Sequence, residues 1–176
     1  MHRCGPMIIV VMGVSGSGKT AVGRALAQRL KGEFLEGDAF HPSVNVEKMQ
    51  RGEPLADQDR SKWLVKLGQV IAARVAEGTP VPTVISCSAL KKSYRDRLRR
   101  ADRSLQLVYL TGSPMLLAER LQRRRDHFMP PSLLPSQLAT LEPPGDDESP
   151  IVAEISSSVA RIVDQVCAAL LHRQRG

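Results

Sequence analysis

The sequence predicts a single α/β domain in three layers, in which helices flank a five-stranded parallel sheet, over residues 1–176. Short β-favouring apolar runs alternate with longer stretches whose apolar residues recur at helical spacing, and this alternation is typical of parallel sheets. A glycine-rich segment, GVSGSGKT, follows the first apolar run and opens the first helical stretch. A strand, a glycine-rich loop and a helix in that order indicate a phosphate-binding loop. A chain of this length can bury one core without disulfide or metal support.

The first half of the chain is expected to supply two strands and two helices. Met7–Met12 is a continuous apolar run, typical of a strand buried on both faces. Lys19–Leu30 follows as a helix, and Glu33–Glu36 as a short second strand. A longer helix comes next and ends at Gly78, a residue type that commonly stops helices. Its apolar stripe consists of Leu64, Leu67, Ile71 and Val75.

The second half continues the alternation. Thr83–Ser88 and Leu105–Gly112 are expected as strands three and four. A helix then begins at Ser113, a candidate cap, with Pro114 in its first turn. Ile151–Ile155 is the fifth strand, and the last helix carries its apolar residues at helical intervals. Those residues are Val159, Ile162, Val163, Val166 and Leu170.

A Pro-rich segment, His127–Pro150, separates the helix that begins at Ser113 from the fifth strand and shows no periodicity. Long irregular segments in compact domains are usually lids or linkers. We therefore expect a mobile lid over approximately residues 123–148.

Composition narrows the classes of function. The net charge is +7, but the chain holds only three Phe, two Tyr and one Trp, so little stacking surface is available for single-stranded nucleic acid. We expect neither a nucleic-acid partner nor membrane insertion, since no apolar segment approaches membrane-spanning length. The three cysteines form no CxxC pair, which favours a reduced, cytoplasmic protein.

The glycine-rich segment matches GxxxxGK[ST] in full and predicts a nucleoside triphosphate site. Its backbone amides would turn toward the phosphates, Lys19 would reach the β- and γ-phosphates, and Thr20 would offer a hydroxyl to Mg²⁺. The residues expected to bind the nucleotide are Gly13, Val14, Ser15, Gly16, Ser17, Gly18, Lys19 and Thr20.

Several enzyme classes share this loop, and the remaining sequence favours small-molecule kinases. No NKxD-type guanine reader is present, and the third strand ends without the carboxylate that motor ATPases use for Mg²⁺. Asp38, just after the second strand, is the acid expected beside the loop, as base, as Mg²⁺ ligand or as both. A helix cap or a turn acid is the alternative for Asp38. His41 and Asn45 follow and are candidates for a polyhydroxy substrate, or for a His-Pro turn and a helix cap.

The chain resembles the gluconokinases over roughly Ile8–Leu171. The resemblance rests on GVSGSGKT, EGDAFHPSVNVEKMQRGEPLADQDRSKWL, SCSALKKSYRDRLR and RRRDHFMPPSLLPSQLATLEP, in that order and spacing. It implies phosphorylation of D-gluconate by ATP to 6-phosphogluconate, which feeds the pentose phosphate and Entner–Doudoroff routes. It also implies a P-loop kinase fold like that of shikimate and nucleoside monophosphate kinases, and a homodimer.

A gluconate carboxylate is best bound by Arg or Lys. Arg60, Lys91 and Arg95 follow strands two and three and are the expected ligands. The alternative for each is a surface ion pair, with Asp57 or Asp59 for Arg60 and Asp96 for Arg95. Ser86 and Ser88 are weaker candidates, and Cys87 between them is expected in the core.

By resemblance, an arginine-bearing helix and the lid close over ATP. Arg120 and Arg124 share one helical face and are expected to contact the nucleotide, or else to form a solvated helix end. His127 is expected to contact the substrate or to pack in the lid. Thr20 and Asp38 are the expected Mg²⁺ ligands.

Two other functions remain open at this point. One is a kinase of another small anion, such as shikimate or a nucleoside monophosphate. The other is a basic nucleic-acid-binding P-loop protein, against which the scarcity of aromatic residues argues.

Overall fold

The computed structural model describes residues 6–78, 80–123 and 129–175, and these form a five-stranded sheet with all strand pairs parallel. The strand order is β2-β3-β1-β4-β5, so the fold class expected from the sequence is confirmed. The strands are β1 (Ile8–Met12), β2 (Glu33–Glu36), β3 (Thr83–Ser86), β4 (Gln106–Thr111) and β5 (Ile151–Glu154).

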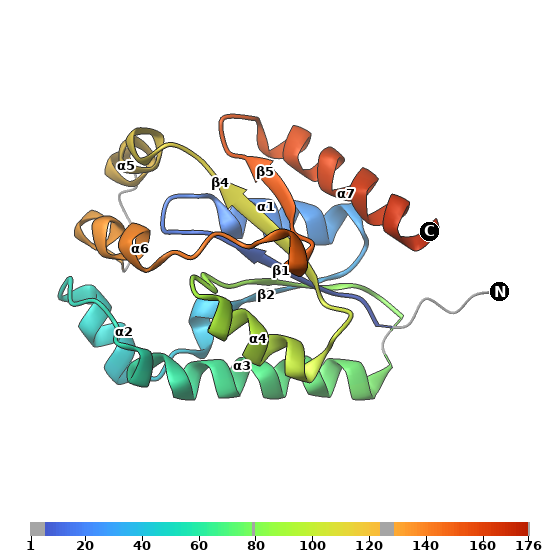
Figure 1. Ribbon diagram of the computed structural model, residues 1–176, viewed down its shortest axis with the longest axis horizontal. Helices are drawn as coiled ribbons and strands as arrows, with labels where there is room; N and C mark the ends of the chain where they lie inside the picture. Colours follow the sequence, from blue (N-terminus) through green and yellow to red (C-terminus); the bar gives the residue numbers. More distant parts are fainter. Residues whose placement is uncertain (1–5, 79, 124–128, 176) are drawn as a thin grey trace.

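Helices cover both faces of the sheet (Figure 1). The α-helices are α1 (Lys19–Arg29), α2 (Ser43–Gln50), α3 (Asp57–Glu77), α4 (Lys92–Ala101), α5 (Pro114–Arg123), α6 (Leu134–Thr140) and α7 (Val159–Arg175). Three short 3₁₀ turns are η1 (Gly37–Phe40), η2 (Pro131–Leu133) and η3 (Asp146–Glu148). Among the described residues, no helix is both long and apolar enough to cross a lipid bilayer.

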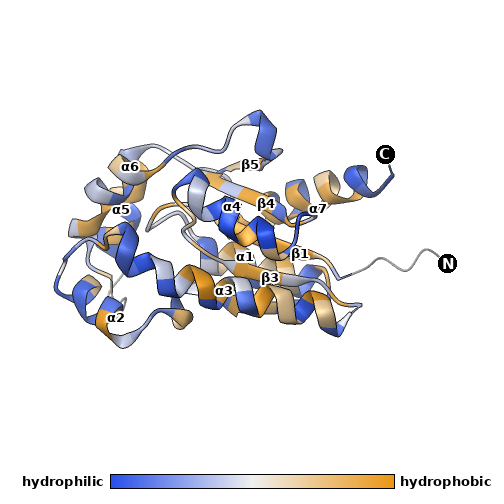
Figure 2. Cartoon of the chain, turned by 60° about the horizontal axis from the view of Figure 1, so that its bottom comes forward, coloured by the Kyte–Doolittle hydropathy of each residue, from blue (hydrophilic) through white to orange (hydrophobic). Residues whose placement is uncertain are grey.

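Alternation along β1 separates two apolar cores. Ile9 and Val11 point into a core shared with α1, α5 and α7. Ile8, Val10 and Met12 point into the opposite core, which α3 and α4 cover. Every residue of β1 is fully buried, as expected for a central strand of a parallel sheet. The central strands are largely orange in the hydropathy colouring of Figure 2, whereas α4 is mostly blue.

The parallel arrangement positions the site. Because β2, β3 and β1 are neighbours and run in one direction, their carboxyl ends meet at one edge of the sheet. The glycine-rich loop follows β1, η1 follows β2, and Ser88 follows β3 at that edge.

The Pro-rich segment is more regular than expected. Residues 134–140 form α6, a short helix that begins with a proline in its first turn, where the missing N–H has no helical partner to lose. Glu142 donates its backbone N–H to the carbonyl of Leu90 over 2.8 Å, which ties the end of the segment to the loop after β3.

A buried ion pair holds the far end of this segment to α4. The guanidinium of Arg95 donates to both carboxylate oxygens of Glu148, each over 2.7 Å, and both side chains are at most 3% exposed. Its third nitrogen donates to the carbonyls of Ala89 and Leu90. Arg99 adds a hydrogen bond to the backbone carbonyl of Glu148. Burial by itself would raise the pKa of Glu148, but hydrogen bonding to Arg95 and its positive charge hold that pKa below 4.5.

The substitution Glu148→Ala should lower the free energy of unfolding by about 3–5 kcal/mol, because it leaves a buried guanidinium without its counter-charge. The matched control is Asp164→Ala, which breaks the Arg29–Asp164 pair, both 61% exposed, and should cost about 0–1 kcal/mol. Urea unfolding at neutral pH measures both. Equal losses for the two variants would contradict the importance of the buried pair.

The same measurement has a defined pH dependence. Because the folded pKa of Glu148 is depressed, the stabilisation is present above its ordinary value of 4.5 and is lost as the pH falls through the folded pKa. The difference between wild type and Glu148→Ala should therefore shrink in acid.

Candidate active site

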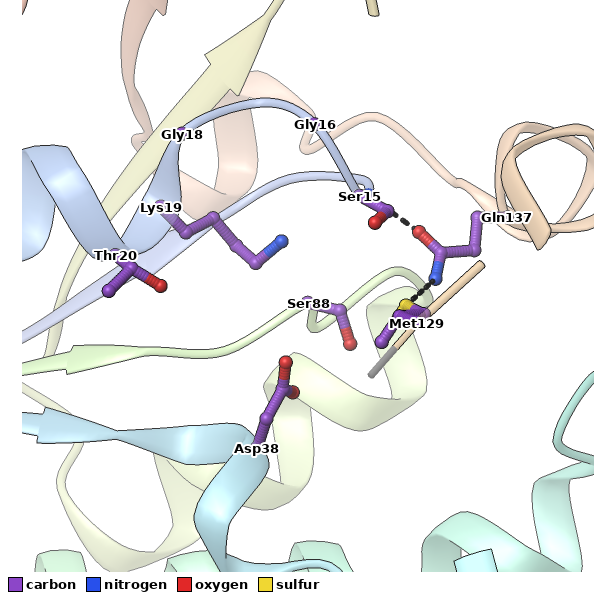
Figure 3. Close-up of a pocket in the computed structure, with 9 residues that line it drawn as sticks. All are labelled: Ser15, Gly16, Gly18, Lys19, Thr20, Asp38, Ser88, Met129 and Gln137. Atoms are coloured by element: carbon purple, nitrogen blue, oxygen red, sulfur yellow. Dashed lines mark hydrogen bonds between the residues drawn. The ribbon is translucent and has the colours of Figure 1, made fainter. Parts of the chain in front are cut away.

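A small pocket lies where the loops after β1, β2 and β3 meet the Pro-rich segment (Figure 3). It combines backbone of the glycine-rich loop with a lysine, a carboxylate and hydroxyl groups. Its walls are formed by Ser15, Gly16, Gly18, Lys19, Thr20, Asp38, Ser88, Met129 and Gln137.

The loop has the backbone geometry of a phosphate cradle. Gly16 and Gly18 have φ values of 83° and 87°, in the left-handed region that glycine adopts without strain. Gly18 is the N-cap of α1 and has no side chain that could cap the helix, so the positive end of the helix dipole faces the loop. The glycine-rich loop and the start of α1 thus have the backbone geometry of an anion site.

Lys19 and Asp38 face each other across the pocket. Lys19 donates from Nζ to the carbonyl of Val14 over 3.1 Å, which lays its side chain along the loop. Asp38 lies in η1, and its side chain is 16% exposed. Burial raises the pKa of Asp38; the positive charge of Lys19 acts against this shift and Glu36 adds to it. The expected proximity of Asp38 to the phosphate loop is thus present in the structure, and its raised pKa suits a group that accepts a proton.

Glu36, the last residue of β2, is a site residue that sequence reasoning missed. Its Oε2 accepts a hydrogen bond of 2.7 Å from the hydroxyl of Thr20, and its Oε1 accepts one from Ser86 on β3. Glu36 therefore joins the loop to two neighbouring strands. The available signal was an acid at the carboxyl end of a strand adjacent to the phosphate loop.

The oxygen groups at this point suit Mg²⁺. A threonine hydroxyl with Glu36 and Asp38 nearby offers hard oxygen donors, which this cation prefers. Within the described ranges, no three His, Cys, Asp or Glu side chains gather as a metal cage. The donor set therefore fits a cation that keeps water and phosphate oxygens as its other ligands.

His41 and Trp63 pack against each other next to η1 and hold it in position. The two rings are stacked with centroids 4.2 Å apart, and Trp63 donates from Nε1 to the carbonyl of Gly37 over 2.8 Å. His41 Nε2 lies 3.9 Å from Asp38 Oδ1, and its Nδ1 lies 3.3 Å from the amide of Asn45. Burial, reinforced by the charge of Arg60, lowers the pKa of His41 to about 4, so the ring is neutral at physiological pH. Trp63 was expected only as part of a motif, and the structure gives it a positioning contact.

Arg60 and Lys91 lie in one charged cluster beside this group. Lys91 Nζ is 2.8 Å from both carboxylate oxygens of Asp57, and Tyr94 donates to the same carboxylate. The guanidinium of Arg60 lies 5.8 Å from the centre of the Tyr94 ring and donates to the carbonyl of Leu55. The alternative expected for Arg60 was an ion pair with Asp57 or Asp59. In the structure Asp57 pairs with Lys91 and Asp59 pairs with Lys48.

The expectation that Arg95 binds a substrate carboxylate needs correction. Arg95 is 2% exposed and bonded to Glu148 and to two backbone carbonyls, so its donors are used inside the fold. It lies on the buried face of α4 together with Tyr94 and Leu98. Its partner is Glu148, where the sequence alternative was Asp96.

Arg120 approaches the loop from α5. It lines a hollow of about 450 Å³ with Gly16, Gly18 and Ser158, and it donates to the carbonyl of Ile155 over 2.5 Å. The hollow lies on the other side of the loop from Asp38, between α5 and the segment that enters α7. Arg124 and His127, also expected at the site, lie outside the described residues.

Gln137 and Met129 connect the Pro-rich segment to the phosphate loop. Gln137 Oε1 accepts a hydrogen bond of 2.6 Å from the backbone N–H of Ser15, and its Nε2 lies 3.2 Å from Met129 Sδ (Figure 3). Sequence reasoning missed both residues because the segment showed no periodicity. The signal was their place in the motifs HFMP and LLPSQ.

Cys87 is confirmed as a core residue. It is 1% exposed, and burial raises the pKa of its thiol to about 12, with the charge of Asp38 acting in the same direction. A thiol held in its neutral form is not a nucleophile.

Comparisons with known proteins identify the family. A family model described as an AAA domain matches residues 8–144. A gluconokinase of Gluconobacter oxydans is 55% identical over 143 residues, which are 81% of this chain and 79% of that protein. The crystal structure of a gluconokinase from Sinorhizobium meliloti is 46% identical, covers 95% of this chain and 93% of its own, and superposes with a TM-score of 0.84.

A more distant likeness concerns the fold alone. The shikimate kinase of Aquifex aeolicus is 14% identical and superposes with a TM-score of 0.60 over 97% of this chain and 99% of its own. The expected relation to shikimate kinase in fold is therefore confirmed. With its AAA-type phosphate loop and its extensive identity to these enzymes, the chain belongs to the gluconokinase family.

Proposed function

We infer that the protein is an ATP-dependent gluconokinase, which transfers the γ-phosphoryl group of ATP to the terminal hydroxyl of D-gluconate and yields 6-phosphogluconate and ADP. Membership of the gluconokinase family supports the substrate, since a relative of that name is 55% identical. The observation that carries the chemistry is the pocket in which Lys19 of the phosphate loop and the buried carboxyl of Asp38 face each other.

Each group has a role in an in-line displacement. The loop amides and Lys19 bind the phosphates, and the charge of Lys19 stabilises the transferred phosphoryl group. The alcohol oxygen forms a bond to the γ-phosphorus while the bond from that phosphorus to the β,γ-bridging oxygen breaks. The alcohol proton passes to the carboxylate of Asp38. Thr20, with Glu36 and Asp38 nearby, would hold Mg²⁺, and the cation would supply neutralising charge to the phosphates.

The two sides of the loop suit the two substrates. The hollow beside Arg120 suits the nucleoside of ATP, because it opens next to the first turn of α1. On the other side, Arg60 lies close enough to His41 to lower its pKa, and Lys91 lies with Arg60 around Asp57 and Tyr94. This positive charge suits the gluconate carboxylate. A homodimer in the cytoplasm, expected from the resemblance and the cysteine pattern, stays a prediction that light scattering and cell fractionation test.

A coupled assay that measures ADP release with ATP tests the assignment. Gluconate should be turned over far faster than shikimate or a nucleoside monophosphate at equal concentration. Phosphorylation of one of the other acceptors in place of gluconate would overturn the proposed substrate.

The substitution Lys19→Ala should lower kcat by about 10²–10³-fold, because it removes one preorganised charge from the transferred phosphoryl group. Steady-state kinetics with gluconate and ATP measure the effect, and circular dichroism verifies the fold. Turnover close to that of wild type would refute the role of Lys19.

The substitution Asp38→Asn should lower kcat by about 10²–10⁴-fold, because the amide cannot accept the alcohol proton. It should also leave the melting temperature at pH 7 unchanged or raise it. The folded pKa of Asp38 lies above 3.8, so the stabilisation from its protonated form is complete below 3.8 and is lost as the pH rises through the folded pKa. Asn removes the cost of ionisation at pH 7. Retained turnover, or a large loss of stability, would contradict this assignment.

The substitution Lys91→Ala should raise the KM for gluconate by about 10-fold with little change in kcat, as expected for a charge that binds ground and transition states equally. Lys92→Ala is the matched control, since Lys92 is exposed and pairs with Asp96 and Asp147. If both variants have the wild-type KM, the gluconate carboxylate binds elsewhere.

A further inference from the structure

The lid segment places a side chain on the phosphate loop itself. Ser15 donates its backbone N–H to Gln137 Oε1 over 2.6 Å, although 122 positions separate the two residues. Gln137 is 9% exposed, so water competes little for this bond. Figure 3 shows the carboxamide between the loop and Met129.

The position of this oxygen is one that an anion would take. In a loop of this type the backbone N–H groups are the donors for phosphate oxygens. A carboxamide oxygen carries partial negative charge and accepts the same hydrogen bond. Because an amide N–H has one hydrogen, Gln137 and a phosphate oxygen compete for Ser15.

The place of Ser15 in the loop indicates which phosphate competes. Ser15 lines the pocket that contains Asp38 and Ser88, whereas Ser17 and Ala21 line the hollow on the nucleoside side. The N–H of Ser15 therefore lies toward the acceptor, where the terminal phosphate of a triphosphate would end.

Contacts on both sides of the substrate pocket, the pocket that contains Lys19 and Asp38, hold Gln137 in place. Its Nε2 contacts Met129 Sδ, and Met129 and Leu133 pack against Met49 and Leu55 from the other side of the crevice. These four residues form the bridging cluster, a small apolar group separate from the two sheet cores. Loss of the hydrogen bond at Ser15 would thus affect the packing of Met129 and Leu133 against Met49 and Leu55, which border the substrate pocket.

We propose that Gln137 is a latch on the phosphate loop, which competes with the terminal phosphate of the nucleotide for the backbone N–H of Ser15. The proposal rests on the proposed function, because it requires that a nucleoside triphosphate binds this loop. Part of the intrinsic affinity for the triphosphate is used to displace the carboxamide, so removal of the acceptor should tighten binding.

The test is the affinity for β,γ-imido ATP with Mg²⁺ and without gluconate, measured by titration calorimetry on the full chain. Gln137→Met keeps the length of the side chain and removes the acceptor. It should bind the analogue about 3- to 10-fold more tightly than wild type, which corresponds to the net strength of one hydrogen bond. Gln137→Ala should change the affinity in the same direction.

Two controls make the result specific. Gln165→Met carries the same substitution on α7, where Gln165 donates to the carbonyl of Val152, and its affinity should equal that of wild type. AMP lacks the terminal phosphate that would compete for the N–H of Ser15, so its affinity should not change in Gln137→Met.

The possible outcomes distinguish a failure of the latch from a failure of the proposed function. If wild type binds the analogue and Gln137→Met binds it equally or more weakly, the latch is refuted and the kinase assignment stands. Equal tightening of AMP would also refute the latch. If wild type does not bind the analogue, the proposed function fails together with the latch.

Discussion

The site depends on three neighbouring parallel strands that end at one edge of the sheet. β3 lies between β1 and β2, so the loops that follow these three strands lie next to one another. Glu36 strengthens this convergence, because its carboxylate accepts hydrogen bonds from Thr20 at the start of α1 and from Ser86 on β3. The positions of the phosphate loop and of Asp38 therefore follow from the strand order together with this one acid.

Burial shifts the pKa values of the groups that lie together at this edge of the sheet. Asp38, His41 and Cys87 lie close to one another, and desolvation favours the neutral form of each. The consequences differ: a carboxyl with a raised pKa gains proton affinity, a histidine with a lowered pKa stays neutral, and a thiol with a raised pKa stays inert. Lys19 keeps a positive charge near the carboxyl and limits its shift.

The sequence predicted the sheet, the phosphate loop and the place of Asp38, because each leaves a local pattern. Alternating apolar runs mark buried strands, and GxxxxGK[ST] fixes a loop conformation through its glycines. α6 was missed because a seven-residue helix with two buried positions, Leu134 and Gln137, is too short for periodicity to appear. Arg95 was misassigned because fully buried arginines are rare, and its partner Glu148 lies 53 positions away. Pairings of that separation leave no trace in local spacing.

Opening of the substrate pocket, as expected for a mobile lid, would separate the residues of the bridging cluster. Met49, Leu55, Met129 and Leu133 can part without disturbing either main core, since they contact one another in a separate group. The free energy holding them together is mainly hydrophobic, and such contacts weaken on cooling. The closed arrangement of the cluster is therefore more stable near ambient temperature than in the cold. Cooling should consequently increase the open population of the pocket, whereas it would decrease that population if hydrogen bonds held the two sides together.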